Sequence, residues 1–287
     1  MNRLKRLNPE IDFSIKYIKT KGDIINDVAL SKIGDKGLFT KELEIALLQG
    51  EIDLAVHSMK DLPTKLPDGL IIGCITEREN PQDVLISNKG YTLATLPPGA
   101  KVGTGSLRRR AQLLYYRSDL FIADLRGNLD TRLSKLETHD FDAIILAAAG
   151  LIRMGWQSVI SEIIPFQILL PAVGQGSLGI EIRHDDGFVQ NVIRGLHHDP
   201  SAYGILAERS LLAHLEGGCQ IPIGAYGKTS GDSIVLEAVV ASIDGAKLIK
   251  DQIIGKIREY TDLGVRLAER MICSGAKDIL DSCRTGE

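Results

Sequence analysis

Apolar and polar residues follow two different periods in the first part of the chain. Residues 11–17 carry an apolar side chain at every second position, which predicts a half-buried strand. Residues 38–48 carry them at helical spacing, and Gly50 stands where a helix C-terminus favours glycine. A short apolar run over residues 52–56 predicts a second strand. The chain therefore opens with the order strand, helix, strand.

The same alternation continues further along the chain. After a glycine-rich turn, Ser106 is a candidate N-cap for a helix that we expect to end near Tyr116. Apolar runs over residues 121–124 and 143–146 predict two strands, with a helix over residues 131–136 between them. Strands that alternate with helices are typical of an α/β fold, for which we expect a mostly parallel sheet.

The pattern changes after Pro200. A helix is predicted to about Leu215, followed by alternating strands over residues 234–241 and 248–254 that are joined near Gly245, and then by helices to the C-terminus. Grouped strands with flanking helices indicate a small α+β domain.

Length and charge narrow the class of protein. A chain of 287 residues, of which 44% are hydrophobic, can bury two cores or three small ones. The net charge of -3 argues against a general nucleic-acid binder, whose surface is normally basic. The most apolar run, residues 143–149, is too short to cross a bilayer, so we expect a cytoplasmic protein with no membrane partner.

The four cysteines form no C-x-x-C pair, which indicates neither a disulfide framework nor a zinc site. Adjacent side chains such as His197, His198 and Asp199 do not converge on one ion, so we expect no metal. Cys219 lies in a turn whose glycines allow a bulky group to approach the sulfur. A lone cysteine is also common as a small buried apolar residue, and the residues around Cys219 leave both interpretations open.

Candidate binding groups gather where predicted strands end. Asp61 follows the strand over residues 52–56, in the sequence HSMKD, while Ser106 opens a helix and Arg126 follows the strand over residues 121–124. Ligands of parallel α/β sheets bind at the carboxyl ends of strands, near helix N-termini. Arginines are concentrated in this part of an acidic protein, which indicates a pocket for a small anion. Each group has an ordinary alternative as a solvated turn or a charged helix start.

Seven short motifs, taken in order, resemble those of porphobilinogen deaminases. Their spacing is that of the family, and together they cover nearly the whole chain from about Ile11, which makes chance similarity implausible. They are KGLF at 36–39, HSMKD at 57–61, GTGSLRR at 103–109, LRGN at 125–128, TRL at 131–133, LPAVGQG at 170–176 and EGGCQ at 216–220.

The resemblance implies an α/β fold, with two periplasmic-binding-protein-like α/β domains and a small C-terminal α+β domain. Domain 1 would comprise residues 1–76 and 177–195, domain 2 residues 82–170 and domain 3 residues 199–287. The resemblance also implies a monomeric enzyme that condenses four porphobilinogen molecules, releasing ammonia and then hydroxymethylbilane, in tetrapyrrole (porphyrin and haem) biosynthesis. A dipyrromethane cofactor would be attached to Cys219 through a thioether and would stay on the enzyme.

The same resemblance implies roles for individual residues. The carboxylate of Asp61 would stabilise the positive charge that develops when ammonia leaves, and would help to move protons. Because each pyrrole brings an acetate and a propionate, the cleft needs many cations and hydrogen-bond donors. The residues matched to cofactor and substrate binding are Lys36, Ser58, Lys60, Thr104, Ser106, Arg108, Arg109, Arg126, Arg132, Arg153 and Gln175, with Lys32 in a supporting place.

One departure changes the expectation for domain 1. Members of the family usually begin with an additional strand and helix that carry an Arg-x-Ser-like segment, whereas this chain opens close to the following strand. We therefore expect domain 1 to lack this strand and helix. Either the gene model is truncated, or the chain has reduced stability or activity. Two alternatives to an active deaminase stay open at this point: an inactive truncated form, and a small-anion-binding protein without chemistry.

Overall fold

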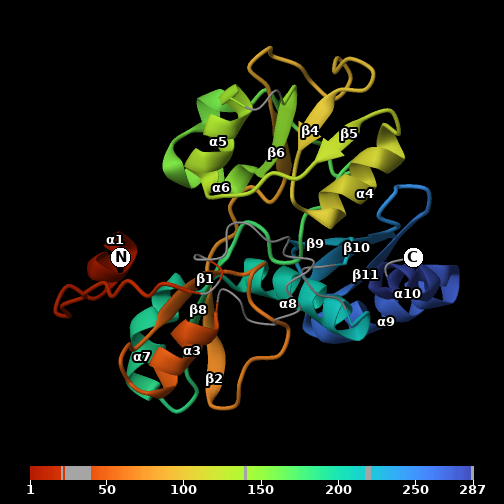
Figure 1. Cartoon of the computed structure of the whole chain (residues 1–287). Helices are drawn as coiled ribbons and strands as arrows, with labels where there is room; N and C mark the ends of the chain where they lie inside the picture. Colours follow the sequence, from red (N-terminus) through yellow and green to blue (C-terminus); the bar gives the residue numbers. More distant parts are fainter. Residues whose placement is uncertain (21, 23–39, 139–140, 217–220, 286–287) are drawn as a thin grey trace.

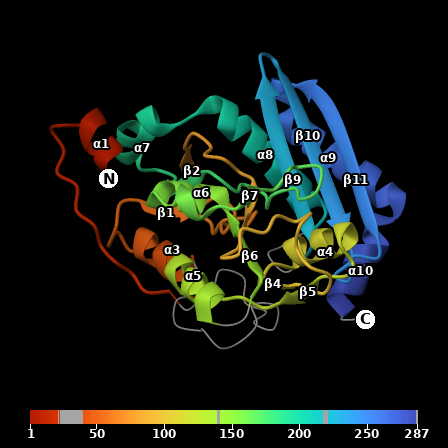
Figure 2. The same cartoon turned by 90° about the horizontal axis from the view of Figure 1, so that it is seen from above.

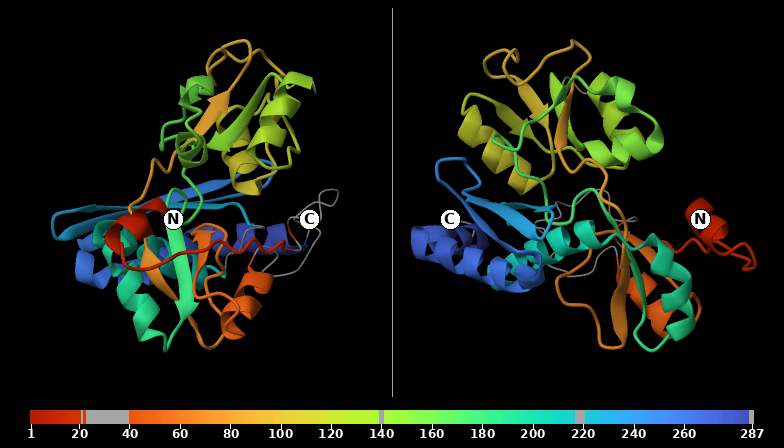
Figure 3. Two further views of the ribbon diagram at one scale, coloured as in Figure 1. Left: turned by 90° about the vertical axis from the view of Figure 1, so that its left-hand side faces the viewer. Right: turned by 180° about the vertical axis from the view of Figure 1, so that it is seen from behind.

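Three β-sheets organise the chain (Figure 1). The computed structural model describes residues 1–20, 22, 40–138, 141–216 and 221–285. We call each sheet with its helices the first, second or third unit, in chain order of their first strands. Figure 1 and both views of Figure 3 show the second unit above the first unit, and Figure 1 and the right view of Figure 3 show the third unit beside the first.

The first sheet has the strand order β1-β8-β2. Its strands are β1 (Ala55–Ser58), β8 (Leu178–Arg183) and β2 (Leu70–Ile75), and β8 runs antiparallel to both neighbours. Helices α3 (Lys41–Leu48) and α7 (Gly187–Ile193) pack on the sheet, and α1 (Asn2–Leu7) packs on α7. Ile180 and Ile182 pack in the cluster that includes α7 residues, whereas Leu47 of α3 packs on Ala55, so the two helices cover opposite faces.

The second sheet has the order β5-β4-β6-β3-β7. Strands β4 (Lys101–Gly103), β5 (Phe121–Ala123) and β6 (Ala143–Ala147) are parallel, whereas β3 (Asp83–Ile86) runs antiparallel to β6 and to the short β7 (Glu162–Ile163). Each parallel strand is followed by a helix, namely α4 (Leu107–Tyr116), α5 (Leu129–Thr138) and α6 (Ala148–Met154). The three strand-to-helix junctions therefore lie at one edge of the sheet.

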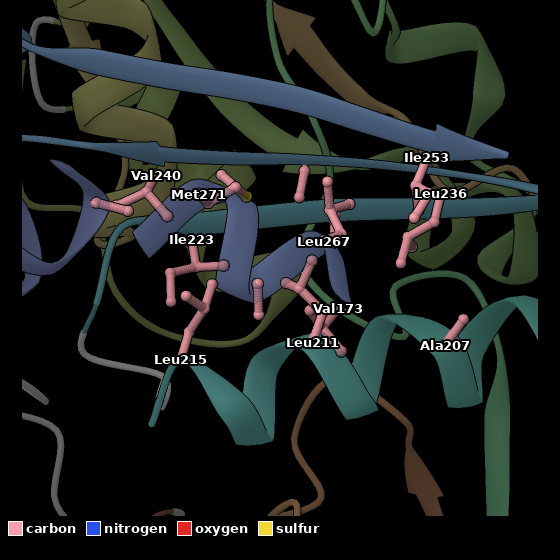
Figure 4. Packing of buried hydrophobic residues seen from close by; sticks show 14 of the residues in the cluster. Val173, Ala207, Leu211, Leu215, Ile223, Leu236, Val240, Ile253, Leu267 and Met271 are labelled. Carbon is pink, nitrogen blue, oxygen red and sulfur yellow. The ribbon is translucent and has the colours of Figure 1, made fainter. Parts of the chain in front are cut away.

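The third sheet is an antiparallel meander of β9 (Ile223–Ser230), β10 (Ser233–Ala241) and β11 (Leu248–Lys256). Its helices are α8 (Asp199–His214), α9 (Tyr260–Met271) and α10 (Lys277–Thr285). Figure 4 shows Leu211 of α8 and Leu267 and Met271 of α9 packed toward Leu236 and Val240 of β10. Seen from above in Figure 2, α4 of the second unit lies beside this sheet, and it contacts β10.

The expected architecture of two α/β units and a small α+β unit is confirmed, but the expectation of mostly parallel sheets is wrong for the described strands. In the first sheet every described pairing is antiparallel, because β8 arrives from a distant part of the chain and inserts between β1 and β2. In the second sheet β3 runs antiparallel to β6. The sequence pattern also missed β9, whose run IGAYGKTS contains two glycines and lacks regular alternation.

The strand predicted over residues 11–17 is also not present. Within residues 8–20, which the structure describes, no residue belongs to a strand. Ile11 and Phe13 pack against the core beside α7, whereas Ile15 is 59% exposed and Tyr17 is 89% exposed. A period-2 pattern makes a strand only where a neighbouring strand supplies hydrogen-bond partners, and no described strand does so here.

Two chain segments connect the first and second units. Residues 76–82 lead from β2 to β3, and residues 164–177 lead from β7 to β8. The two segments are joined to each other, since the N–H of Glu79 donates to the carbonyl of Gly176 at 3.0 Å. In the part of the chain that the structure describes, no helix is long and apolar enough to span a membrane.

Candidate active site

The carboxyl ends of β4 and β5 place three of the predicted site residues at one edge of the second sheet. Thr104 follows β4 and is 3% exposed, and its Oγ1 accepts a hydrogen bond from the N–H of Ser106 at 3.3 Å. Ser106 is the N-cap of α4, as predicted, because its Oγ accepts from the N–H of Arg109 at 3.4 Å. Arg126 follows β5 and is half-buried. The parallel direction of these strands brings the groups to the same edge.

The loop after β1 carries Ser58, Lys60 and Asp61. Ser58 is the last residue of β1, and the N–H of Asp61 donates to its carbonyl at 2.9 Å, which closes a turn. Met59 anchors this turn, since its side chain is buried and its N–H donates to the carbonyl of Ser177 at 3.0 Å. Asp61 is exposed and Lys60 is half-buried. The anchored turn therefore presents the carboxylate of Asp61 at the surface of the first unit.

Charges of the first and second units act on one another across their junction. Burial lowers the pKa of Lys60 below its usual 10.5, while the carboxylate of Asp61 opposes this effect and the guanidinium of Arg109 adds to it. Burial also lowers the pKa of Arg132, with Arg109 adding to the effect and Asp61 opposing it. Such interactions need short separations. Lys60 and Asp61 therefore lie close enough to the arginines of the second unit to interact with them electrostatically.

Arg108 and Arg109 both bind a carboxylate of the protein itself. Asp83, the first residue of β3, has no exposed surface, and its Oδ2 accepts from Arg108 Nη1 at 2.7 Å. Its Oδ1 accepts from Nε and Nη2 of Arg109 at 3.1 and 2.7 Å, and from Nε2 of Gln175 at 2.9 Å. Although burial alone raises the pKa of Asp83, the two guanidinium groups lower it well below its usual 3.8. The carboxylate stays ionised inside the protein.

Arg132 and Arg153 are each held by one hydrogen bond to the backbone. Nε of Arg132 donates to the carbonyl of Gly127 at 2.7 Å, and Nη2 of Arg153 donates to the carbonyl of Gly176 at 2.6 Å. Within the described ranges, their other guanidinium nitrogens have no hydrogen-bond partner. Arg132 is half-buried and Arg153 is exposed, so both can reach an anionic ligand.

Three of the sequence-predicted residues, Lys32, Lys36 and Cys219, lie outside the described residues. The two histidines considered for a metal have other partners: Nδ1 of His198 lies 2.8 Å from Ser201 Oγ at the start of α8, and the N–H of Ile75 donates to His197 Nδ1 at 3.2 Å. Among residues whose positions are described, no group of three or more His, Cys, Asp or Glu side chains is placed to hold a metal ion.

Sequence reasoning missed Asp83, although the sequence contains a signal for it. Asp83 opens the run Asp83–Ile86, whose other residues are all apolar, and a carboxylate in a fully buried strand requires cationic or hydrogen-bonding partners. No local pattern indicates which arginines those partners are. The contact depends on how β3 lies against α4.

The assembled site has a definite chemical character. The exposed carboxylate of Asp61 interacts electrostatically with Lys60 and Arg132, and the hydroxyl groups of Thr104 and Ser106 lie at the edge of the second sheet. Such a site suits a ligand that carries several carboxylates together with a centre that becomes positively charged. Arginine forks match the geometry of carboxylates, whereas Asp61 would repel them.

Comparison with solved structures gives matches at low identity. The chain resembles a probable amino-acid ABC transporter extracellular-binding protein of Bacillus subtilis at 12% identity, with 68% of this chain and 78% of that chain covered and a TM-score of 0.39.

Comparison of sequences gives much closer matches. Residues 1–191 match the family profile described as "Porphobilinogen deaminase, dipyromethane cofactor binding domain", and residues 202–273 match "Porphobilinogen deaminase, C-terminal domain". The chain is 53% identical to a porphobilinogen deaminase of Desulforamulus reducens, covering 100% of this chain and 93% of that protein. It is 54% identical to one of Pelotomaculum thermopropionicum, covering 100% and 92%. With these matches along its length, the chain belongs to the porphobilinogen deaminase family.

Proposed function

We propose that this chain catalyses the porphobilinogen deaminase reaction. It condenses four porphobilinogen molecules on a dipyrromethane cofactor, releases ammonia at each condensation and finally releases hydroxymethylbilane, as a step of tetrapyrrole biosynthesis. The observation that carries the proposal is the match over the whole chain to porphobilinogen deaminases, and the effects of Lys60, Asp61, Arg109 and Arg132 on one another's charge support it. Family membership supplies the substrate, since relatives covering the whole chain are named for porphobilinogen.

The residues of the site suit a cofactor that carries carboxylates. Arg132 and Arg153 each use one guanidinium nitrogen on a backbone carbonyl and keep the others for a ligand. Arg108, Lys60 and Ser106 add two cations and a hydroxyl, and Ser58, Thr104, Arg109, Arg126, Gln175 and Lys36 complete the proposed set. When bound, the cofactor supplies the pyrrole to which the first substrate is joined. The chain's own contribution is to neutralise and orient the acetate and propionate groups.

Asp61 is the proposed catalytic residue. Positive charge develops on the substrate as ammonia leaves, and a fixed carboxylate beside the pyrrole nitrogen stabilises that charge. Backbone hydrogen bonds hold the turn of residues 58–61, and within the described residues the carboxylate of Asp61 has no side-chain hydrogen-bond partner. This leaves its oxygens available to the substrate and to a proton of the reacting pyrrole.

Cys219 is the proposed attachment residue. A thiolate attacks an electrophilic methylene well, and the resulting thioether resists hydrolysis and reduction, as permanent attachment requires. The other cysteines are poorer candidates: burial raises the pKa of the Cys74 thiol to about 11 and that of the Cys283 thiol above its usual value. Cys273 is exposed on the third unit and offers a matched control.

The proposal extends to the setting of the enzyme. We propose a cytoplasmic monomer with no metal, no nucleic-acid partner and no membrane partner. For nucleic acid, the proposal is supported by Arg108 and Arg109, which are each 5% exposed and so offer little basic surface to a polyanion. The domain limits expected from the sequence also stay a prediction, supported by the grouping of β3 to β7 within residues 82–170.

Intact-protein mass spectrometry of the full chain tests the proposal most directly. We expect an added mass equal to a dipyrromethane on the wild-type chain and on Cys273→Ser, and none on Cys219→Ser. Incubation of the loaded protein with porphobilinogen should then release ammonia. An unmodified wild-type chain that releases no ammonia would overturn the proposed activity, and an adduct that persists in Cys219→Ser would overturn the attachment residue alone.

A further inference from the structure

The fully buried carboxylate of Asp83 lies outside the seven motifs that carry the resemblance to the family. It accepts two hydrogen bonds from Arg109, one from Arg108 and one from Gln175. We propose that Asp83 is a positioning residue that fixes the guanidinium groups of Arg108 and Arg109 in the site. This inference rests on the proposed function, because it concerns how the same site holds its carboxylate ligands.

Arg109 is bound through all three of its guanidinium nitrogens. Nε and Nη2 donate to Oδ1 of Asp83, and Nη1 donates to the carbonyl of Ile145 in the central strand β6 at 2.9 Å. A two-pronged contact with a carboxylate ligand would require Arg109 to release Asp83. Arg109 therefore acts on a ligand through its charge, while its position is set by the protein.

Arg108 is held through a single guanidinium nitrogen among the described residues. Its Nη1 donates to Oδ2 of Asp83 at 2.7 Å and to the carbonyl of Leu170 at 2.6 Å. Among the described residues, Nε and Nη2 of Arg108 have no hydrogen-bond partner. These two contacts fix one nitrogen of the buried guanidinium, and loss of the Asp83 carboxylate would leave Leu170 as the remaining anchor of Arg108 among the described residues.

Gln175 links this arrangement to the connections between the first and second units. Its Nε2 donates to Oδ1 of Asp83 and, at 2.7 Å, to the carbonyl of Pro81. Gln175 belongs to the connection of residues 164–177, and Pro81 belongs to the connection of residues 76–82. Asp83 thus links Arg108 and Arg109 to the two segments that connect the first and second units.

Asp83 also contributes to the balance of charges around Lys60. The charged groups that act on Lys60 are Asp61 and Asp83, which favour its ammonium form, and Arg109 and Arg108, which oppose it. Without the carboxylate of Asp83, burial and two arginines would act on Lys60 against Asp61 alone. The ammonium of Lys60 would then lose its proton at a lower pH.

The test compares Asp83→Asn with the wild-type chain and with a matched control, Asp119→Asn. Asp119 lies beyond the other end of α4 and accepts two hydrogen bonds from Arg117 at 2.7 Å, but it is exposed and remote from the junction. In folded Asp83→Asn we expect cofactor loading to fall and the KM for porphobilinogen to rise by about 10- to 100-fold. The alkaline limb of the pH–rate profile should move to lower pH. Asp119→Asn should match the wild type in cofactor loading, in KM and in the pH–rate profile.

A second readout does not depend on activity. In nitrogen-15 NMR spectra, the Nε–H group of Arg109 should give an exchange-protected signal in the wild-type chain, and Asp83→Asn should lose that protection. This signal also separates the two proposals, since it tests the arginine pair even if the wild-type chain proves inactive. Normal loading, KM and pH profile in folded Asp83→Asn, or an unprotected Arg109 signal in the wild type, would overturn the inference.

If Asp83→Asn fails to fold, Asp83→Glu tests whether the position of the carboxylate matters for ligand binding. The longer side chain keeps the negative charge but displaces it, so we expect a raised KM with an unchanged alkaline limb. A KM equal to that of the wild type in Asp83→Glu would show that the position of the carboxylate is unimportant, and the inference would fail.

Discussion

Arg78 and Glu208 form a buried ion pair at which all three units meet. Both Nη atoms of Arg78 donate to the carboxylate of Glu208, which has no exposed surface. The same carboxylate accepts the backbone N–H groups of Gly174 and Gly227, each at 2.7 Å. Arg78 and Gly174 belong to the two connections between the first and second units, whereas Glu208 and Gly227 belong to the third unit. One side chain of α8 therefore holds both connections.

The first prediction concerns stability. Arg78→Ala leaves the carboxylate of Glu208 buried without its cation, which should lower the free energy of unfolding by about 3–5 kcal/mol. The measurement is urea unfolding of the full chain at neutral pH. Arg266→Ala is the control, because Arg266 forms an exposed ion pair with Asp262 at 3.4 Å, whose loss should change the free energy of unfolding by less than about 1 kcal/mol. Equal losses in the two variants would contradict the prediction.

The second prediction concerns the chemical step. Asp61→Asn keeps the size of the side chain but removes its charge, so turnover of porphobilinogen should fall by about 100- to 1000-fold in protein that carries the cofactor. Single-turnover ammonia release measures the effect. Asp68→Asn changes another exposed aspartate close in sequence and should leave the rate unchanged. Near-normal turnover in loaded Asp61→Asn would remove Asp61 from the mechanism.

The third prediction concerns ligand binding. Arg132→Ala removes a cation at the junction and should raise the KM for porphobilinogen by about tenfold or more, with a weaker dependence of KM on salt. Steady-state kinetics at two salt concentrations measure both quantities. Arg258, whose side chain is 74% exposed and lies near Glu259, provides the control variant Arg258→Ala. If both variants shift KM equally, the role of Arg132 is not specific.

The fourth prediction concerns thiol reactivity and pH. Burial raises the pKa of Cys74 to about 11 from its usual 9.0, so the native protein should protect this thiol from alkylation at pH 8, whereas Cys273 reacts at once. Urea should make Cys74 reactive. Because the folded pKa exceeds the unfolded one, the associated stability is complete below pH 9.0 and is lost as the pH rises through about 11. Peptide mapping of the alkylated cysteines measures the labelling of Cys74 and Cys273. Rapid labelling of Cys74 in the native protein would contradict the prediction.

Much of the site could be predicted from local patterns. Strand ends, glycine turns and a serine N-cap are encoded within a few residues, which is why Ser106 and the turn that carries Asp61 were predictable. The same patterns misjudged residues 11–17, since alternation reports a potential strand and not the presence of a partner. They also could not show that Arg109 is held inside the protein, because an arginine at a helix start has the same sequence whether it faces solvent or a buried carboxylate.

The sequence by itself determined the family, the α/β architecture and the residues that carry charge at the strand ends, since these depend on periodicity and on short motifs. Only the tertiary structure decided the direction of β8 between β1 and β2 and the partners of the buried charges. Gln175 reaches Asp83 across 92 positions of the chain, and Arg78 reaches Glu208 across 130. Such pairs are set by how whole units pack, and a buried carboxylate requires a cation without specifying where along the chain that cation lies.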